Sequence, residues 1–213
     1  MTKTLSSVCQ HCVSKHAKNT LADKCLCDSC FAALCERKLR RNLRNYDLKR
    51  DEQVLFLEDT SSKALGHLTH IPLKLTTAML SNAELSAAAL FDAGIIDRHL
   101  KEHAAQRIVV PWTMDDENEK FLREILTYKK GHRKDNTQKF QEKNLIKLFA
   151  PLSRTETQQY CTIKKIPYSG QIHKSNTLGK MLDAFEKKYP GTKTSIAQSA
   201  KDLRQRLSQG AKA

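Results

Sequence analysis

The stretch that decides the fold is Val54–Leu68, VLFLEDTSSKALGHL. It begins with a short apolar run, VLFL, which predicts a buried strand over 54–58, and a helical pattern follows over 61–70. A strand joined to a helix by a short loop is typical of a nucleotide-binding unit, because such a loop presents backbone N–H groups to phosphate. This joint, however, contains two acids, Glu58 and Asp59, and no glycine.

The acids make the joint a poor phosphate site. An unpaired carboxylate beside a phosphate oxygen is repelled by about 1–4 kcal/mol at effective dielectric constants of roughly 80 to 20. Without glycine, the backbone also cannot approach the phosphate closely. Magnesium can bridge acids to phosphate, but such a site normally adds acids to a working loop. We therefore expect no nucleotide to bind the loop formed by Glu58, Asp59, Thr60, Ser61 and Ser62.

Strand and helix patterns alternate along the rest of the chain. Further strands are predicted at 107–112 and 144–152. Helices are predicted from Ser81 to a stop at Gly94, from Asp115 to a stop at Gly131, and at 155–163, 176–189 and 194–207, with a basic loop over 132–143. The alternation predicts an α/β fold with a parallel sheet, whose ligands bind at the carboxyl ends of the strands.

Six of the seven cysteines lie before residue 36. Two C-x-x-C pairs, Cys9 with Cys12 and Cys27 with Cys30, have the spacing of a closed structural zinc site of four thiolates. Zinc binding would stabilise the folded state of this N-terminal segment, which is too small to form a hydrophobic core of its own. Two alternatives stay open at this point: Cys25 can replace Cys27 as a ligand, and the metal can be an iron–sulfur cluster.

A basic helix is predicted over 29–45, where apolar residues recur at helical spacing and Cys35 is expected as a buried thiol. The chain carries a formal net charge of +14, which indicates an anionic partner such as nucleic acid. The helix and the residues after it form the candidate RNA-binding surface, although an ordinary solvated face stays open as an alternative. The residues assigned to this surface are Arg37, Lys38, Arg40, Arg41, Arg44, Lys49 and Arg50.

The chain is expected to divide at residue 50. Residues 1–50 would form the zinc module with its basic helix, and residues 51–213 the α/β domain with C-terminal helices. No apolar run approaches the roughly 20 residues that cross a bilayer. The N-terminal stretch lacks the apolar core of a signal peptide. We therefore expect a cytoplasmic protein without a membrane partner.

This order of features resembles that of tRNA thiolases of the PP-loop ATP pyrophosphatase type. Active members carry Ser-Gly-Gly-x-Asp-Ser where this chain has 57–62, and only Ser62 matches. The segment 111–122 is similar to the superfamily's Gly-His-x-x-Asp-Asp-x-x-Glu-x-x-Leu, with Pro-Trp replacing Gly-His. Segments 151–154 and 188–196 resemble its Pro-Leu-Arg and Tyr/Phe-Pro-Gly/Ser-Thr motifs.

The degenerate loop looks most like that of the cytoplasmic tRNA 2-thiolation protein 2 family, the eukaryotic non-catalytic sister of the active enzymes. The resemblance implies the PP-loop, adenine nucleotide alpha-hydrolase-like fold. It implies a non-catalytic subunit for 2-thiolation of the wobble uridine in tRNA, with no catalytic residue and no bound ATP of its own. Its partner would be an active PP-loop thiolase, in a heterodimer, that takes sulfur from a thiocarboxylated ubiquitin-like carrier.

A rival hypothesis is an active ATP- and magnesium-dependent tRNA sulfurtransferase whose nucleotide site is rebuilt on Asp59, Asp115 and Asp116. Acids in a first turn also cap a helix, and we expect that role for Asp115 and Asp116. Cys161, the one cysteine beyond the zinc module, is expected in the core. Trp112 either packs in the core or stacks on a base. A zinc-ribbon nucleic-acid binder unrelated to thiolation would leave the alternation after residue 53 unexplained.

Overall fold

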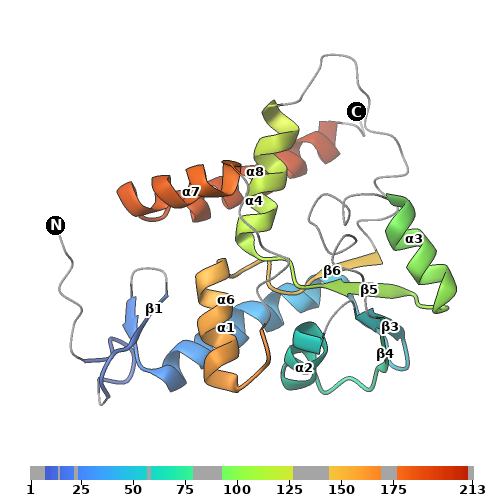
Figure 1. Ribbon diagram of the computed structural model, residues 1–213, viewed down its shortest axis with the longest axis horizontal. Helices are drawn as coiled ribbons and strands as arrows, with labels where there is room; N and C mark the ends of the chain where they lie inside the picture. The colour runs from blue at the N-terminus through green and yellow to red at the C-terminus, as the bar shows by residue number, and fades with distance from the viewer. Residues whose placement is uncertain are drawn as a thin grey trace.

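The computed structural model describes residues 8–13, 15–21, 24–56, 59–78, 93–126, 144–168 and 177–210. Within them, a parallel sheet has the strand order β4-β3-β5-β6 (Figure 1). In chain order its strands are β3 (Gln53–Phe56), β4 (Lys74–Thr77), β5 (Arg107–Val110) and β6 (Leu145–Lys147). The predicted parallel α/β sheet is therefore confirmed.

The strands of this sheet divide their side chains between two apolar clusters. On β3, Val54 and Phe56 enter one cluster, whereas Leu55 between them enters the other. The same alternation holds on β5, where Val109 faces the first cluster and Ile108 the second. A parallel sheet buried on both faces has continuous apolar strands, which is why these runs could be read from the sequence.

Helices on both faces complete the two clusters. The first cluster contains side chains from α1 (Asp28–Leu43), α2 (Asp59–Leu68) and α6 (Arg154–Lys164). The second contains side chains from α3 (Ala93–Glu102), together with the fully buried Trp112. The sheet thus lies between two helical layers, and no helix among the described residues is long and apolar enough to cross a membrane.

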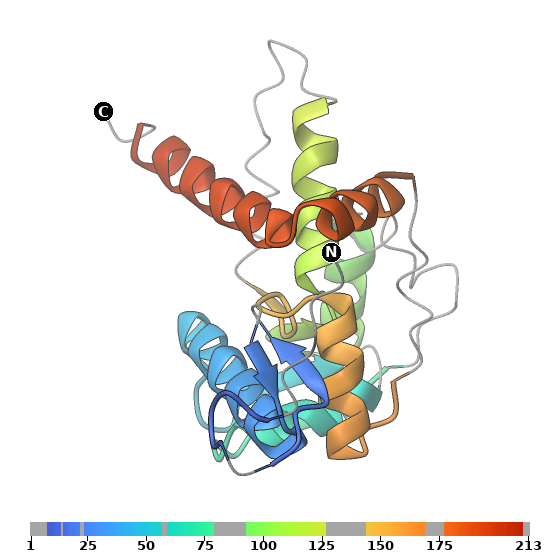
Figure 2. The same cartoon turned by 90° about the vertical axis from the view of Figure 1, so that its left-hand side faces the viewer.

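Three further helices lie beyond the carboxyl end of β5. Helix α4 (Met114–Leu126) follows β5 directly, and α7 (Thr177–Lys188) and α8 (Thr192–Gly210) both pack against it. Figure 2 shows α7 and α8, in red, passing in front of α4 and above the N-terminal hairpin, which lies on the same side of the molecule. The break between α7 and α8 agrees with the predicted helices at 176–189 and 194–207. Gly191 lies in this break with a positive φ of 91°, which glycine adopts without strain.

The N-terminal segment packs onto this body. Strands β1 (Asn19–Leu21) and β2 (Lys24–Leu26) form an antiparallel pair, and α1 runs on into a 3-10 turn, η1 (Arg44–Tyr46). Apolar side chains of β1, β2 and α1 belong to the same cluster as Val54 and Phe56. Asn42 Nδ2 also donates to Lys147 O at 2.9 Å. The segment therefore shares a core with the sheet, while the domain division at residue 50 stays a prediction.

Some predicted elements differ from the observed ones. Gly94 does not end a helix, because α3 begins at Ala93 and continues to Glu102, with Ile96 and Leu100 packed four residues apart. Strand β5 ends at Val110, before Pro111, which has no N–H for the ladder. Strand β6 ends at Lys147 and turns, although Leu148 and Phe149 stay buried. The predicted helix over 81–92, the stop at Gly131 and the basic loop over 132–143 lie outside the described residues.

Candidate metal centre and nucleic-acid interface

The structure brings the four cysteines of the two C-x-x-C pairs together. Cys9 and Cys12 lie on the turn before β1, and Cys27 and Cys30 lie at the start of α1. Their four sulfur atoms all lie within 4.8 Å of one another, and Cys12 Sγ is 3.8 Å from Cys27 Sγ. The group is a possible metal site.

The sulfur spacing fits a single tetrahedral ion. Zinc–sulfur bonds of about 2.3 Å place the four sulfurs of a tetrahedron about 3.8 Å apart. In a four-iron cluster each thiolate binds a different iron atom, so the sulfurs must stand further apart than around one ion. The separation of Cys12 and Cys27 therefore matches one ion, and the 4.8 Å limit leaves only small movements for the others.

The protonation chemistry of the group also suits a cation. Burial of Cys9 works against its thiolate, but hydrogen bonds from backbone N–H groups, that of Cys12 foremost, lower the pKa of its thiol to about 6. A hydrogen bond with the Ser29 hydroxyl lowers the pKa of Cys27. Burial, together with the neighbouring sulfurs, raises the pKa of Cys30 to about 12. Some thiolates therefore form readily, and a metal ion would be needed to stabilise all four at once.

The remaining cysteines lie outside this group. Cys25 belongs to β2, where it pairs with Thr20, and its N–H donates to Gln10 Oε1 at 2.9 Å. The group therefore contains Cys27 and not Cys25. Cys35 and Cys161 are fully buried in the first cluster, and burial raises the pKa of Cys35 to about 12. The core prediction for both thiols is confirmed.

The degenerate loop joins β3 to α2. Leu57, Glu58 and the side chain of Asp59 lie outside the described residues, and α2 begins at Asp59. Thr60 Oγ1 donates to Pro167 O at 2.6 Å, and Ser61 is fully buried. These two hydroxyl groups face the protein interior, and only Ser62 of the three hydroxyl residues is partly exposed.

The paired acids at the start of α4 are buried and engaged within the protein. Asp116 Oδ2 accepts from Thr113 N at 2.8 Å and from Thr113 Oγ1 at 2.6 Å, which closes the first turn of the helix. Asp115 Oδ2 accepts from Arg154 N at 2.6 Å, and its Oδ1 contacts Lys193 Nζ. The predicted capping role is confirmed for Asp116, while Asp115 connects α4 to α6 and α8.

Cations from other elements neutralise this acidic turn. Arg154 Nη2 lies 3.6 Å from Asp116 Oδ1 and 3.7 Å from Glu119 Oε1. Lys147 Nζ lies 2.7 Å from Glu117 Oε1 and 4.9 Å from the centre of the Trp112 ring. Trp112 is only 1% exposed, so it is a core residue. Sequence reasoning missed these cation partners, because they lie far along the chain from the acids.

The basic surface assigned to RNA lies mainly on the solvent side of α1. Lys38 is half-buried and lies 3.9 Å from Glu156, whereas the other six residues are exposed. Arg40 pairs with Glu36 at 3.1 Å, and Arg50 with Asp51 at 3.8 Å. Within the described part of the chain, ion pairs are absent from four members of the surface: Arg37, Arg41, Arg44 and Lys49.

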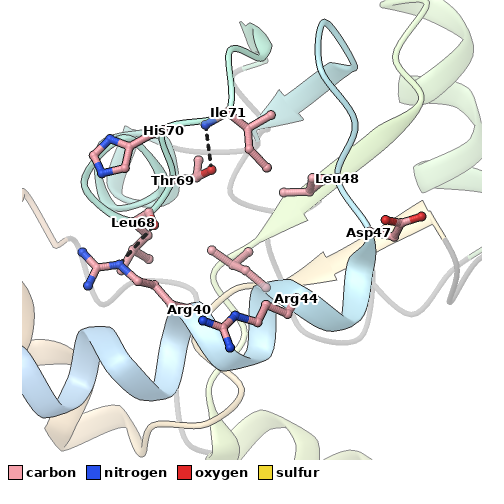
Figure 3. A pocket seen from close by; sticks show the side chains of 9 residues that line it. Arg40, Arg44, Asp47, Leu48, Leu68, Thr69, His70 and Ile71 are labelled. Atoms are coloured by element: carbon pink, nitrogen blue, oxygen red, sulfur yellow. Dashed lines mark hydrogen bonds between the residues drawn. The ribbon is translucent and has the colours of Figure 1, made fainter.

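A cavity of about 380 Å³ borders this surface, between the end of α1 and the connection from α2 to β4. Figure 3 shows Arg40 and Arg44 along one side and His70 across from them. Arg40 Nε donates to Leu68 O at 3.2 Å, which ties the two sides together. Leucine side chains supply the apolar lining. The α2–β4 side of this cavity was missed from the sequence, since it has no charge run or motif.

The class defined by these features is an α/β protein with a parallel sheet, a four-cysteine centre and a basic helix. One solved structure with this fold is the U34-tRNA thiolase NcsA from Methanococcus maripaludis with its [4Fe-4S] cluster, which has a TM-score of 0.60 to this chain. The match covers 93% of this chain and 87% of that chain, at 15% sequence identity. No protein-family model and no curated protein matches the chain. The likeness shows that the fold is similar to that of this U34-tRNA thiolase.

Proposed function

We propose that the chain is a non-catalytic subunit for 2-thiolation of the wobble uridine in tRNA, working in the cytoplasm as a heterodimer with an active PP-loop thiolase. One observation carries the proposal. In a fold similar to that of a U34-tRNA thiolase, the joint between β3 and α2 holds acids where active members are expected to hold glycines. The scaffold of a nucleotide site is kept, but its phosphate-binding loop is lost.

The described part of the joint supports this interpretation. Helix α2 has already begun at Asp59, the position that corresponds to the second glycine of the active motif. Thr60 and Ser61 direct their hydroxyl groups into the protein, where Thr60 bonds to Pro167 O. A phosphate at this end of the sheet would meet neither a glycine backbone nor these hydroxyls.

The contacts of the acidic turn weigh against the rival hypothesis of a remodelled magnesium site. Asp115 and Asp116 are 3% and 5% exposed, and their oxygens already accept backbone N–H groups or contact cations. A magnesium ion normally keeps several waters and binds carboxylates that are open to solvent and substrate. Recruiting these two acids would require α4, α6 and α8 to separate.

A structural zinc ion in the four-cysteine group is part of the proposal. The sulfur separations suit one tetrahedral ion, and the group joins the turn before β1 to the start of α1. Zinc there would hold the N-terminal turn against the start of α1 and so fix the amino end of the basic helix. The proposed tRNA-binding residues are Arg37, Lys38, Arg40, Arg41, Arg44, Lys49 and Arg50.

The partner subunit would supply the nucleotide site and receive sulfur from the thiocarboxylated ubiquitin-like carrier. This chain would add a tRNA-binding surface, on which the Arg and Lys side chains along α1 would pair with phosphates of the tRNA. Two observations support the heterodimer: the motifs occur in the same order as in the thiolases, and the fold is similar to that of a thiolase. A chain that keeps this fold without a working phosphate loop is suited to pair with a related subunit whose loop is intact.

The test uses the purified full-length chain in three assays: ATP binding with and without magnesium, release of pyrophosphate, and binding of unmodified tRNA. We expect tRNA binding without ATP binding or turnover. Deletion of the gene should remove wobble 2-thiouridine, and the tagged chain should co-purify with a protein that carries Ser-Gly-Gly-x-Asp-Ser. Pyrophosphate release that disappears in a Ser62→Ala variant would overturn the proposal in favour of an active enzyme.

A further inference from the structure

A second group of side chains of the types that bind metal ions lies at the end of α3, far from the cysteines in sequence. His99, Glu102 and His103 follow one another at positions i, i+3 and i+4, so they share one face of the helix. One ligand atom from each lies within 4.8 Å of the others. The spacing was visible in the sequence, but neither histidine lies near a cysteine pair or a recognised motif.

The separations match nitrogen and oxygen ligands around one ion. Zinc bonds of about 2.0–2.1 Å to histidine nitrogen and carboxylate oxygen place tetrahedral donors about 3.3–3.4 Å apart. His99 Nδ1 lies 3.6 Å from Glu102 Oε2. The two imidazole rings lie 6.2 Å apart at an interplanar angle of 10°, so small side-chain rotations would bring His103 to the same centre.

The backbone beneath this group is fixed on several sides. His103 N donates to His99 O at 3.1 Å, and His103 O accepts from Gln53 Nε2 at 2.8 Å. Ile96 and Leu100 on the same helix are buried in the second cluster. The three ligands therefore stand on a rigid helix end that is attached to the first residue of β3.

Charge and exposure also favour a cation here. The carboxyl end of a helix carries partial negative charge, and the group lies there, with His99 and Glu102 in the last turn of α3 and His103 directly after it. The His99 side chain is 12% exposed, whereas that of Glu102 is 54% exposed. An ion would thus be enclosed by the imidazole on one side and reached from solvent on the other.

We propose that His99, Glu102 and His103 form a second metal site that binds a zinc ion, with the fourth position held by water. Two imidazoles and one carboxylate form a ligand set that zinc accepts, whereas magnesium and calcium prefer oxygen ligands alone. The site lies beside the first residue of β3, whereas the degenerate loop follows the opposite, carboxyl end of that strand. It is therefore independent of the proposed thiolation role.

The test measures zinc bound by the full-length chain after equilibrium dialysis against buffered free zinc. We expect two zinc ions per wild-type chain, and one per chain in the His103→Ala and Glu102→Gln variants at the same free zinc. Loss of a direct ligand should weaken the second site at least about tenfold, since losing an outer partner alone typically costs that much. Lys101→Ala on the exposed side of the same helix, and His70→Ala elsewhere, should both keep two.

Cobalt(II) distinguishes the two sites in the same protein. Thiolates give intense charge-transfer absorption with cobalt, whereas nitrogen and oxygen ligands give only weak d–d bands. The His103→Ala variant should keep the thiolate band and lose the second, weak set of bands. The proposal is overturned if the wild-type chain binds no more zinc than a variant in which His99 and His103 are both changed to alanine.

Discussion

The carboxylate of Asp115, near the start of α4, accepts the backbone N–H of Arg154 at 2.6 Å, 39 positions further along the chain. The other oxygen of the same carboxylate contacts Lys193 Nζ at the start of α8. One buried side chain thus connects three helices at the carboxyl end of the sheet. An acid that the sequence offers as a magnesium ligand has instead become an internal connection.

Removal of this connection should destabilise the fold. We expect Asp115→Ala to lower the free energy of unfolding by about 1–3 kcal/mol, because it leaves the Arg154 N–H and one side of the Lys193 ammonium without their buried partner. Urea denaturation followed by circular dichroism measures the change. Asp202→Ala on the exposed side of α8 is the matched control and should change the free energy by less than about 0.5 kcal/mol. Equal effects of the two variants would contradict the assigned role of Asp115.

The Lys193 contacts predict a dependence of stability on high pH. Burial works against the charged form, but hydrogen bonds from its ammonium to Asp115 and Asp183 raise the pKa of Lys193 above its ordinary value of 10.5. A raised pKa in the folded state contributes stability that is complete below the ordinary pKa and is lost as the pH rises through the folded value.

The wild-type chain should therefore be more stable than a Lys193→Met variant at pH 8, and the difference should shrink above about pH 10.5. Urea midpoints measured at several pH values between 8 and 12 provide the comparison. Lys201→Met, at an exposed position of α8, corrects for the general effect of losing a lysine. A difference that stayed constant across the range would show that the Lys193 charge does not hold α8 in place.

Metal removal should unfold the N-terminal segment. We expect the Cys27→Ser variant to lose the ion of the four-cysteine group and to melt at a lower temperature, because structural zinc contributes folding energy directly. Cys25→Ser is the control, since Cys25 lies two residues away but outside the group. Metal analysis and thermal melts test both variants, and loss of metal from Cys25→Ser with retention in Cys27→Ser would reverse the ligand assignment.

The basic surface predicts a defined salt dependence of tRNA binding. Each phosphate contact adds about 0.7–0.9 to the slope of log affinity against log salt concentration. Arg41→Ala and Arg44→Ala should each reduce that slope by about 0.7–0.9, the value of one lost phosphate contact. Each variant should also bind every tRNA tested more weakly. Fluorescence anisotropy across a salt series measures it. Lys187→Ala on α7 serves as the charge-matched control, and an unchanged slope in both α1 variants would place the RNA elsewhere.

The sheet was largely visible in the sequence because its central strands are buried on both faces. Val54–Phe56 and Ile108–Val110 are unbroken apolar runs, whereas a strand with one face in water would alternate apolar and polar residues. Strand β4 was missed because Lys74–Thr77 is an edge strand with mostly exposed, partly polar residues. Helix α3 was also missed, because Gly94 looked like a helix stop although the apolar spacing continues through Ile96 and Leu100.

The candidate site was predictable only where its members lie close in sequence. The two C-x-x-C pairs identify four sulfurs without knowledge of the fold, since each pair is a local turn. The partners of the acidic turn cannot be identified in that way. Arg154 and Lys193 approach Asp115 only after α6 and α8 have packed, and a lysine 78 positions away carries no local signal.

The alternation of β3 between two apolar clusters has a consequence for how the sheet finds its alignment. Val54, Leu55 and Phe56 are all apolar, so a shift by one residue would still bury hydrophobic groups on both faces. The register between β3 and β5 must therefore be set at the amino ends of the two strands, where polar groups can form their hydrogen bonds in one register only. Gln106 N donates to Gln53 O at 2.9 Å, and Arg107 Nε donates to the buried Glu52 at 2.8 Å. The polar contacts at the amino ends of β3 and β5 therefore set the pairing register that the apolar residues of these strands leave open.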